Sequence, residues 1–218
     1  MKYSLLLFFL LPTLCVPLAA QTKVLFEDHF EDNRFNWDLS ATDKKSAEIR
    51  DGLLIVNTKT KASGTFFTQT VPVPEGADMD ISLSLTQRSG PENMGFGLCW
   101  GLREGEKDFY ALLISTNGKY TILRMRRGKF SELKRWTLSR FIEPKGKPNL
   151  ITVRKRGDVL HFYINNQPIF SGPWEPVRGG RMGLVVYGTM KIETDFLSIR
   201  IPPPATPQPR ADEPKEKE

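Results

Sequence analysis

The fold of this chain is decided by residues 94–127, which read MGFGLCWGLREGEKDFYALLISTNGKYTILRMRR. Apolar, aromatic and β-branched residues dominate three segments of this stretch, and turn-forming residues separate them. The pattern predicts three neighbouring β-strands, at residues 95–102, 109–115 and 119–126.

The dipeptide Asn117-Gly118 joins the last two segments and is a strong hairpin signal, because both residues tolerate a positive φ. A two-residue turn at this point would extend the pairing back to Phe109 opposite Arg126. Side chains alternate between the two faces of a strand, so this register predicts which residues share a face.

In this register one face of the hairpin is apolar and is predicted to be core: it carries Tyr110, Leu112, Ile114, Thr121, Leu123 and Met125. The other face combines rings with guanidinium groups, at Tyr120, Arg124 and Arg126. Rings stack on sugar faces, and guanidinium groups bind hydroxyl, carboxylate or sulfate groups, so we predict that these three bind a ligand. Trp100 on the neighbouring segment is a fourth candidate, with burial in the core as the alternative.

Turn signals recur roughly every ten residues along the rest of the chain, which is typical of an all-β sandwich or barrel. Asp51-Gly52, Gly157-Asp158 and Asn165-Asn166 are expected to close hairpins. The segment 79–87 alternates between apolar and polar residues, as a half-buried strand does. Further strands are predicted at residues 24–26, 47–50, 53–57, 65–71, 149–155, 159–164, 167–171, 179–187 and 192–199, whereas 131–142 is expected to be a strand end followed by a loop.

Both ends of the chain are predicted to lie outside the folded domain, which we place at residues 21–200. Residues 1–20 combine Lys2, a short apolar run and a small-residue cleavage site after Ala20, the pattern of a secretory signal peptide. We therefore expect export to the periplasm, cell surface or medium, with an uncleaved anchor as the alternative and no other membrane-spanning segment. Residues 201–218 are proline-rich and then charged, and are expected to be disordered.

The formal charge of the 218-residue chain is +6, and the basic residues are unevenly spread. Thirteen Lys and Arg residues, but only Glu132 and Glu143 of opposite charge, fall between residues 119 and 156. Such a field concentrates anions, which in an exported protein would be anionic polysaccharide, envelope polymer or lipid headgroups rather than nucleic acid. The alternative is that these charges keep edge strands from pairing with one another.

Eight pieces follow one another along residues 22–200: LFEDHFEDNRFNW, EIRDGLLIV, DISLSL, SGPENMGFGLCWG, DFYALLISTNGKYTI, VRKRGDVLHFYINNQPI, GGRMGLVVYG and DFLSIR. Their order and spacing resemble the concanavalin A-like lectin/glucanase superfamily, in particular the laminin-G-like jelly-roll domains of exported bacterial proteins. The resemblance implies a sandwich of two curved antiparallel sheets, with the first and last strands side by side and a concave face that often takes sugars. It does not imply one function, because relatives include hydrolases, carbohydrate-binding modules and scaffold modules.

Hydrolases of this superfamily carry their carboxylates on one strand in a Glu-x-Asp-x-x-Glu pattern, because the reaction needs an acid and a nucleophile at a fixed separation. The chain lacks this pattern, so we do not expect a glycosidase. The alternative is a glycoside or keto-disaccharide hydrolase, an activity named for some relatives, with carboxylates from a loop: Glu104, Glu106 and Asp108.

No cofactor is indicated by the residues themselves. His29 and His161 are far apart in the sequence and accompany no Cys/His cluster, so zinc is not expected. Some relatives bind calcium near the joined termini, and by this resemblance Asp28 and Asp195 would supply ligands if the first and last strands pair. The alternative is that these carboxylates are solvated or cap turns.

Together these observations favour an exported, non-enzymatic module that binds carbohydrate or another anionic envelope polymer on the exposed face of a sheet. The second hypothesis is a protein-interaction or scaffold domain, which an exposed apolar patch would favour.

Overall fold

The computed structural model describes residues 21–103, 105, 108–176 and 179–204, and every regular element in these ranges is a β-strand. The twelve strands are β1 (Lys23–Asp28), β2 (Lys45–Arg50), β3 (Leu53–Thr70), β4 (Met79–Ser89), β5 (Phe96–Leu102), β6 (Phe109–Ser115), β7 (Lys119–Arg126), β8 (Lys129–Leu138), β9 (Pro148–Arg156), β10 (Val159–Ile164), β11 (Gln167–Pro173) and β12 (Arg181–Ile201). The all-β prediction is confirmed. The predicted signal peptide and residues 205–218 of the predicted tail lie outside the described residues.

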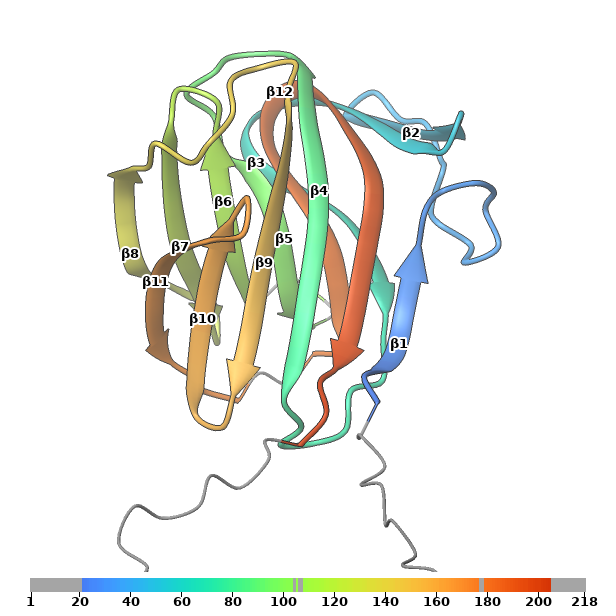
Figure 1. Ribbon diagram of the computed structural model, residues 1–218. Helices are drawn as coiled ribbons and strands as arrows, with labels where there is room; N and C mark the ends of the chain where they lie inside the picture. The colour runs from blue at the N-terminus through green and yellow to red at the C-terminus, as the bar shows by residue number, and fades with distance from the viewer. Residues whose placement is uncertain (1–20, 104, 106–107, 177–178, 205–218) are drawn as a thin grey trace, which may run out of the picture.

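The strands form two layers that share one long strand (Figure 1). The front layer contains β11, β10, β9, β4 and the second half of β12, and the back layer contains the first half of β12 with β5, β6, β7 and β8. Residues 183–186 of β12 pair with β5 and residues 196–200 pair with β4, with Gly188 (φ 84°) between the two halves. Because β12 pairs with β4 of the front layer and with β5 of the back layer, the two layers belong to one hydrogen-bonded sheet, and β3 pairs with both halves of β12.

The first and last strands lie side by side, as the resemblance implies. β1 pairs antiparallel with the end of β12, with Lys23 opposite Ile201. Ile201, the first residue of the predicted tail, is therefore the last residue of a strand. Among the described residues there is no helix that could span a membrane.

The main hydrophobic core lies between the two layers. On β4, Ile81, Leu83 and Leu85 are buried and alternate with partly exposed polar residues, as predicted. The back layer contributes larger side chains, among them Trp100 and Tyr110, both 0 % exposed. Complete burial of one large apolar side chain stabilises a fold by about 1.5–3 kcal/mol, so this shared core holds the layers together.

The register of the β6–β7 hairpin differs by one residue from the predicted register. Ser115 pairs with Lys119, so the loop contains three residues instead of two. Within the loop only Gly118 has a positive φ (85°), and its N–H donates to the carbonyl of Ser115 at 3.0 Å. A three-residue hairpin loop with glycine in the left-handed region explains the shift, whereas the prediction assumed positive φ at both Asn117 and Gly118.

This shift reverses the predicted roles of the two faces of β7. Tyr120 pairs with Ile114 and is 3 % exposed, so it belongs to the main core. Arg124 pairs with Tyr110, and Arg126 follows on the same face. The predicted ring-and-guanidinium face therefore exists, but it is the inner face of the strand, on which Tyr120 is buried, Arg124 is partly buried and Arg126 at the strand end is exposed. Three residues predicted to be core lie on the outer face, where the first two are nevertheless buried: Thr121, Leu123 and Met125.

The other turns agree with the predictions, while several strand boundaries do not. Three predicted turns each contain two residues, because the residues on either side of them pair with each other: Asp51-Gly52, Gly157-Asp158 and Asn165-Asn166. Residues 129–138 form strand β8, where mainly a loop was expected. The separate strands predicted at 53–57 and 65–71 are parts of β3, and those at 179–187 and 192–199 are parts of β12.

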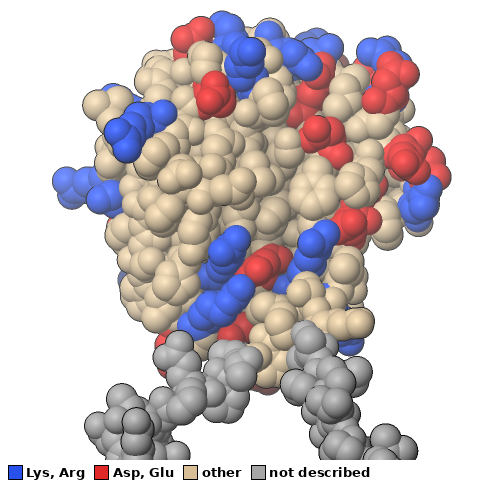
Figure 2. Space-filling view, viewed as in Figure 1, with Lys and Arg blue, Asp and Glu red and all other residues tan. Residues whose placement is uncertain are grey.

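The outer faces of the two layers differ in chemistry. The front face, shown in Figure 2, has a broad uncharged area in its upper part and charged side chains of both signs across its lower part and along its margins. On this face Ser82 and Thr152 of neighbouring strands have their hydroxyl oxygens 2.9 Å apart. The outer face of the back layer carries a second apolar cluster, which includes Phe109, Leu113 and Val185.

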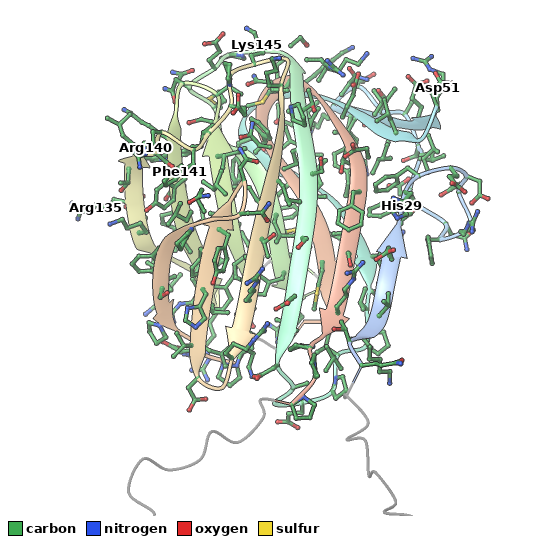
Figure 3. All side chains as sticks on the ribbon, viewed as in Figure 1. His29, Asp51, Arg135, Arg140, Phe141 and Lys145 are labelled. Carbon is green, nitrogen blue, oxygen red and sulfur yellow. The ribbon has the colours of Figure 1, made fainter. Side chains whose placement is uncertain are left out.

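The basic residues expected to form one field are divided between separate places. Arg135 and Arg140 lie at the outer edge of the back layer, and Lys145 lies at the upper end of the sandwich (Figure 3). The ammonium of Lys145 is 3.0 Å from the carboxylate of Glu92. The run of basic residues in the sequence therefore does not correspond to one patch on the surface.

Candidate ligand pocket between the layers

A pocket of about 490 Å³ opens at the end of the sandwich where β4 begins and β9 ends, the lower end in Figure 1. Its inner wall includes Met79, Trp100 and Met182, all at most 4 % exposed. Exposed residues of the β3–β4 loop and of the Gly157-Asp158 turn form its rim. The pocket therefore leads from solvent to the main core.

The loop between β3 and β4 closes one side of the pocket. Pro72 and Pro74 favour the end of strand pairing, because proline has no N–H to donate. Gly76 has a φ of 73°, a conformation that glycine adopts readily. The loop is tied to the β9–β10 turn, since the carboxylate of Asp78 accepts a hydrogen bond from the Gly157 N–H at 2.7 Å. Two segments distant in sequence thus make one wall.

Lys155 is the buried cation of the pocket, with 5 % of its side chain exposed. Its ammonium donates to the carbonyl of Gly76 at 2.9 Å and lies 3.6 Å from the carboxylate of Asp78. It also lies 5.8 Å from the centre of the Trp174 ring. A buried ammonium requires such partners, so Lys155 fastens the β3–β4 loop and its charge is compensated inside the protein.

Three aromatic rings stack beside the pocket. The rings of Trp100 and Tyr110 have centres 5.4 Å apart and planes 7° apart, and those of Tyr110 and Trp174 have values of 5.9 Å and 21°. Trp100 and Tyr110 pair across β5 and β6, whereas Trp174 follows β11 and donates its backbone N–H to the carbonyl of Asp158 at 2.8 Å. Trp174 is partly exposed and lines the pocket, so a ligand would meet a positioned aromatic ring.

The indole N–H of Trp100 is buried and has no hydrogen-bond partner among the described residues. An unsatisfied buried donor of this kind costs about 1–3 kcal/mol. Because Trp100 lines the pocket, a ligand that brings an acceptor to this donor would remove that cost.

Two of the predicted arginines hold the segment that carries Trp174. Arg124 lies 2.5 Å from the carboxylate of Glu175, and Arg126 donates a hydrogen bond to the same carboxylate. The hydrogen bond from Arg124 lowers the pKa of Glu175, and the same contact raises the pKa of Arg124. The arginines therefore position a wall of the pocket.

A smaller hollow of about 30 Å³ lies beside this ion pair, and Asp108 and Glu175 both line it. That volume has room for a water molecule and not for a sugar. Asp108 is also engaged, because it accepts a hydrogen bond from the Arg127 N–H at 2.5 Å and lies 3.7 Å from Arg103. The other two carboxylates of the hydrolase alternative, Glu104 and Glu106, lie outside the described residues.

The four predicted ligand-binding residues thus have different surroundings. Trp100 is buried in the main core, which was the alternative, and its side chain forms part of the inner wall of the pocket. Arg124 and Arg126 hold the neighbouring segment. Tyr120 donates from the core to the carbonyl of Ile169 at 3.0 Å, and burial raises the pKa of its hydroxyl. The sequence reasoning missed Lys155 and Trp174. The only signal for Trp174 was its position in the run Pro173-Trp174-Glu175-Pro176, where a large ring lies between prolines at the end of a strand.

The two aspartates considered for calcium do not combine into a binding site. Asp28 is 4 % exposed, and its two carboxylate oxygens accept hydrogen bonds from the Phe30 N–H and the Trp37 indole N–H, both at 2.7 Å. Asp195 is exposed on β12. In the part of the chain that the structure describes, no three His, Cys, Asp or Glu residues are grouped to hold a metal ion.

Comparison with known proteins gives similarity at the level of structure only. No protein-family model and no curated protein matches the chain. The CBM2 module (a carbohydrate-binding module) of the evolved Dit protein of Lactobacillus casei BL23 phage J-1 matches with a TM-score of 0.59 and 10 % identity, over 85 % of this chain and 98 % of that one. A protein of unknown function from Shewanella oneidensis MR-1 matches with a TM-score of 0.57 and 11 % identity, over 94 % and 100 %.

An enzyme is also among the similar structures. Xylan β-1,4-xylosidase from Bacillus halodurans C-125 matches with a TM-score of 0.58 and 14 % identity, over 80 % of this chain but only 38 % of the enzyme. At identities this low the similarity concerns the fold, and the chain shares a β-sandwich fold with these proteins.

Proposed function

We propose that this protein is an exported, non-enzymatic module that binds carbohydrate in the pocket between its layers. The observation that carries the proposal is a pocket of about 490 Å³ lined by Trp100 and Trp174. Ligand sites are typically concave, of about 300–1,000 Å³, and lined by apolar and aromatic residues with a few polar groups. The flat face of an indole suits the C–H face of a sugar ring, and Asp158 and Lys155 supply polar groups nearby.

Two further observations support this proposal. The fold is similar to that of the CBM2 module of the phage protein, which makes a carbohydrate ligand a reasonable first choice. The signal-like sequence of residues 1–20 supports export, and the superfamily suggested by the resemblance remains part of the proposal together with its jelly-roll topology.

The proposal is tested by screening the purified protein against a panel of neutral and anionic glycans, followed by calorimetry on those it binds. Trp174→Ala should weaken binding at least about tenfold, because truncation of a tryptophan at the centre of a binding site is typically costly. Trp136→Ala is the matched control, since this tryptophan is also partly exposed but lies on β8 beside Gly95.

A second variant covers the case in which Trp174→Ala does not fold. Ala77 lines the pocket from the β3–β4 loop, so Ala77→Trp should fill the space without removing a core contact. Binding that survives this variant at full strength would place the ligand elsewhere. A protein that binds no glycan in the panel would contradict the proposed function itself.

A second candidate function, protein interaction, is favoured by the edge strand β8. Phe130, Trp136 and Leu138 on this strand are 58 %, 42 % and 73 % exposed, and β8 is the last strand of its layer. Exposed apolar side chains along an open strand edge are typical of surfaces that take up a partner strand. A partner recovered from an envelope extract should be lost with the double variant Phe130→Ser and Leu138→Ser but retained with Trp174→Ala.

A further inference from the structure

We infer that the pocket takes the end of a neutral glycan chain, an uncharged terminal sugar, and not the interior of an anionic polymer. This inference rests on the proposed function and narrows its ligand. It differs from the expectation of an anionic ligand that the basic composition raised.

The charges of the described residues around the pocket do not favour an anion. Among the described residues that line it, Glu75, Lys155 and Asp158 are charged. The ammonium of Lys155 is compensated by the carbonyl of Gly76 and the carboxylate of Asp78. Glu75 and Asp158 are exposed at the rim and pair with no cation of the described residues. Among the described residues, an anionic sugar would therefore approach two carboxylates before it met a side-chain donor inside.

The pocket is also closed at its inner end. Met79, Trp100 and Met182 belong to the main core, and the ring of Trp100 is backed by the stacked ring of Tyr110. A close-packed interior lets no polymer chain pass through. A glycan that reaches this inner wall therefore does so by one of its ends, unlike a chain that lies along an open sheet face and contacts several sugar units.

The inner wall includes Trp100, whose buried indole N–H would suit an uncharged sugar that displaced the side chains around it. The buried indole N–H of Trp100 has no acceptor among the described residues, and a hydroxyl or ring oxygen of a sugar is an acceptor of the required kind. Met79 and Met182 beside it are unbranched and flexible, so they can adjust as a sugar ring enters. Trp174 nearer the opening would then support the face of the same ring.

The inference is tested with neutral oligosaccharides of increasing length, taken from the glycan types that the protein binds, and with their acidic counterparts. Calorimetry on the intact protein should give a dissociation constant, expressed per oligosaccharide molecule. This constant should change by less than about threefold as the oligosaccharide becomes longer than the shortest one that binds. One protein should bind per chain, whatever the length. Acidic counterparts should bind at least about tenfold more weakly. Immobilising an oligosaccharide through one end should abolish binding, and immobilising it through the other end should not.

The outcomes separate this inference from the proposed function. Affinity that rises with every added unit, or several proteins on one chain, would overturn recognition of a chain end while leaving carbohydrate binding intact. Tighter binding to the acidic series, weakened by salt, would overturn the preference for a neutral sugar. Trp136→Ala should reproduce the wild-type length dependence, and Trp174→Ala should weaken binding at every length.

Discussion

Replacing Trp100 by phenylalanine should leave the stability of the protein nearly unchanged, whereas the same replacement at Trp37 should be strongly destabilising. Both tryptophans are buried, at 0 % and 5 % exposure. They differ in one hydrogen bond. The indole N–H of Trp37 donates to the carboxylate of Asp28 at 2.7 Å, and that of Trp100 has no acceptor among the described residues.

The expected magnitudes follow from this difference. Buried aromatic side chains cover roughly 150–250 Å², so a change from indole to phenyl forfeits at most about 100 Å², or about 2.5 kcal/mol. At Trp100 the removal of an unsatisfied donor returns about 1–3 kcal/mol, which leaves a net change within about 1.5 kcal/mol of zero. At Trp37 the lost hydrogen bond to a carboxylate adds about 1.5–3 kcal/mol, for a total of about 4–5.5 kcal/mol.

Urea unfolding of the two variants and the wild type, followed by far-ultraviolet circular dichroism, measures both free energies of unfolding. If Trp100→Phe proves as destabilising as Trp37→Phe, then the N–H of Trp100 has a partner in solution and the reasoning from an unsatisfied donor is wrong. Trp100→Phe should also bind the glycan at least about fivefold more weakly, because the phenyl ring cannot donate a hydrogen bond.

Three further predictions concern the segments around the core. Glu175→Gln should lower the free energy of unfolding by only about 0.5–1 kcal/mol, because the ion pairs are partly exposed, but should measurably weaken glycan binding in calorimetry by loosening one wall of the pocket. The hydrogen bond from Lys45 lowers the pKa of Asp38 to about 2, so its carboxylate contributes stability above its ordinary pKa of about 4 that is lost as the pH falls through 2. Thermal unfolding should therefore show Asp38→Asn to be less stable than the wild type at neutral pH and equal to it in strong acid. Gly97→Ala would place a Cβ 2.0 Å from a backbone carbonyl oxygen of β6 and should cost more than about 3 kcal/mol in urea unfolding, whereas Gly76→Ala meets nothing within 4 Å and should cost about 1–2 kcal/mol through its positive φ.

The turns show which parts of the fold local sequence can predict. Asp51-Gly52 forms the expected two-residue turn, with positive φ at both positions. Asn117-Gly118 looks equivalent in sequence, but its loop makes contacts with distant residues. The hydroxyl of Thr116 donates to the side chain of Gln87 at 2.5 Å, and the Asn117 N–H donates to the carbonyl of Glu92 at 3.0 Å. These tertiary contacts accompany the longer loop, and no local pattern reveals them.

The site could be predicted less well than the strands, for a related reason. Alternation of apolar and polar residues is a property of one strand, so β4 and β10 could be identified from sequence alone. The pocket is instead made by residues that only the stacking of the layers brings together, such as Trp100 on β5 and Lys155 on β9. The one-residue shift in register then decides that Tyr120 faces the opposite layer instead of solvent.

The arrangement of the layers also explains why a pocket forms at this end of the sandwich. Along one side, β12 joins the layers by pairing with β4 and with β5. Along the other, the ammonium of Lys134 lies 5.6 Å from the centre of the Phe170 ring, so β8 and β11 approach each other across the gap. At the upper end, the side chain of Asn165 donates to the carbonyl of Phe141 and binds that loop to the front layer. At the lower end, the β3–β4 loop, the β9–β10 turn and the segment after β11 surround the pocket, and Trp100 forms part of its inner wall. Ligand preference would thus depend on loop residues that can change without disturbing the strand pairing of the core.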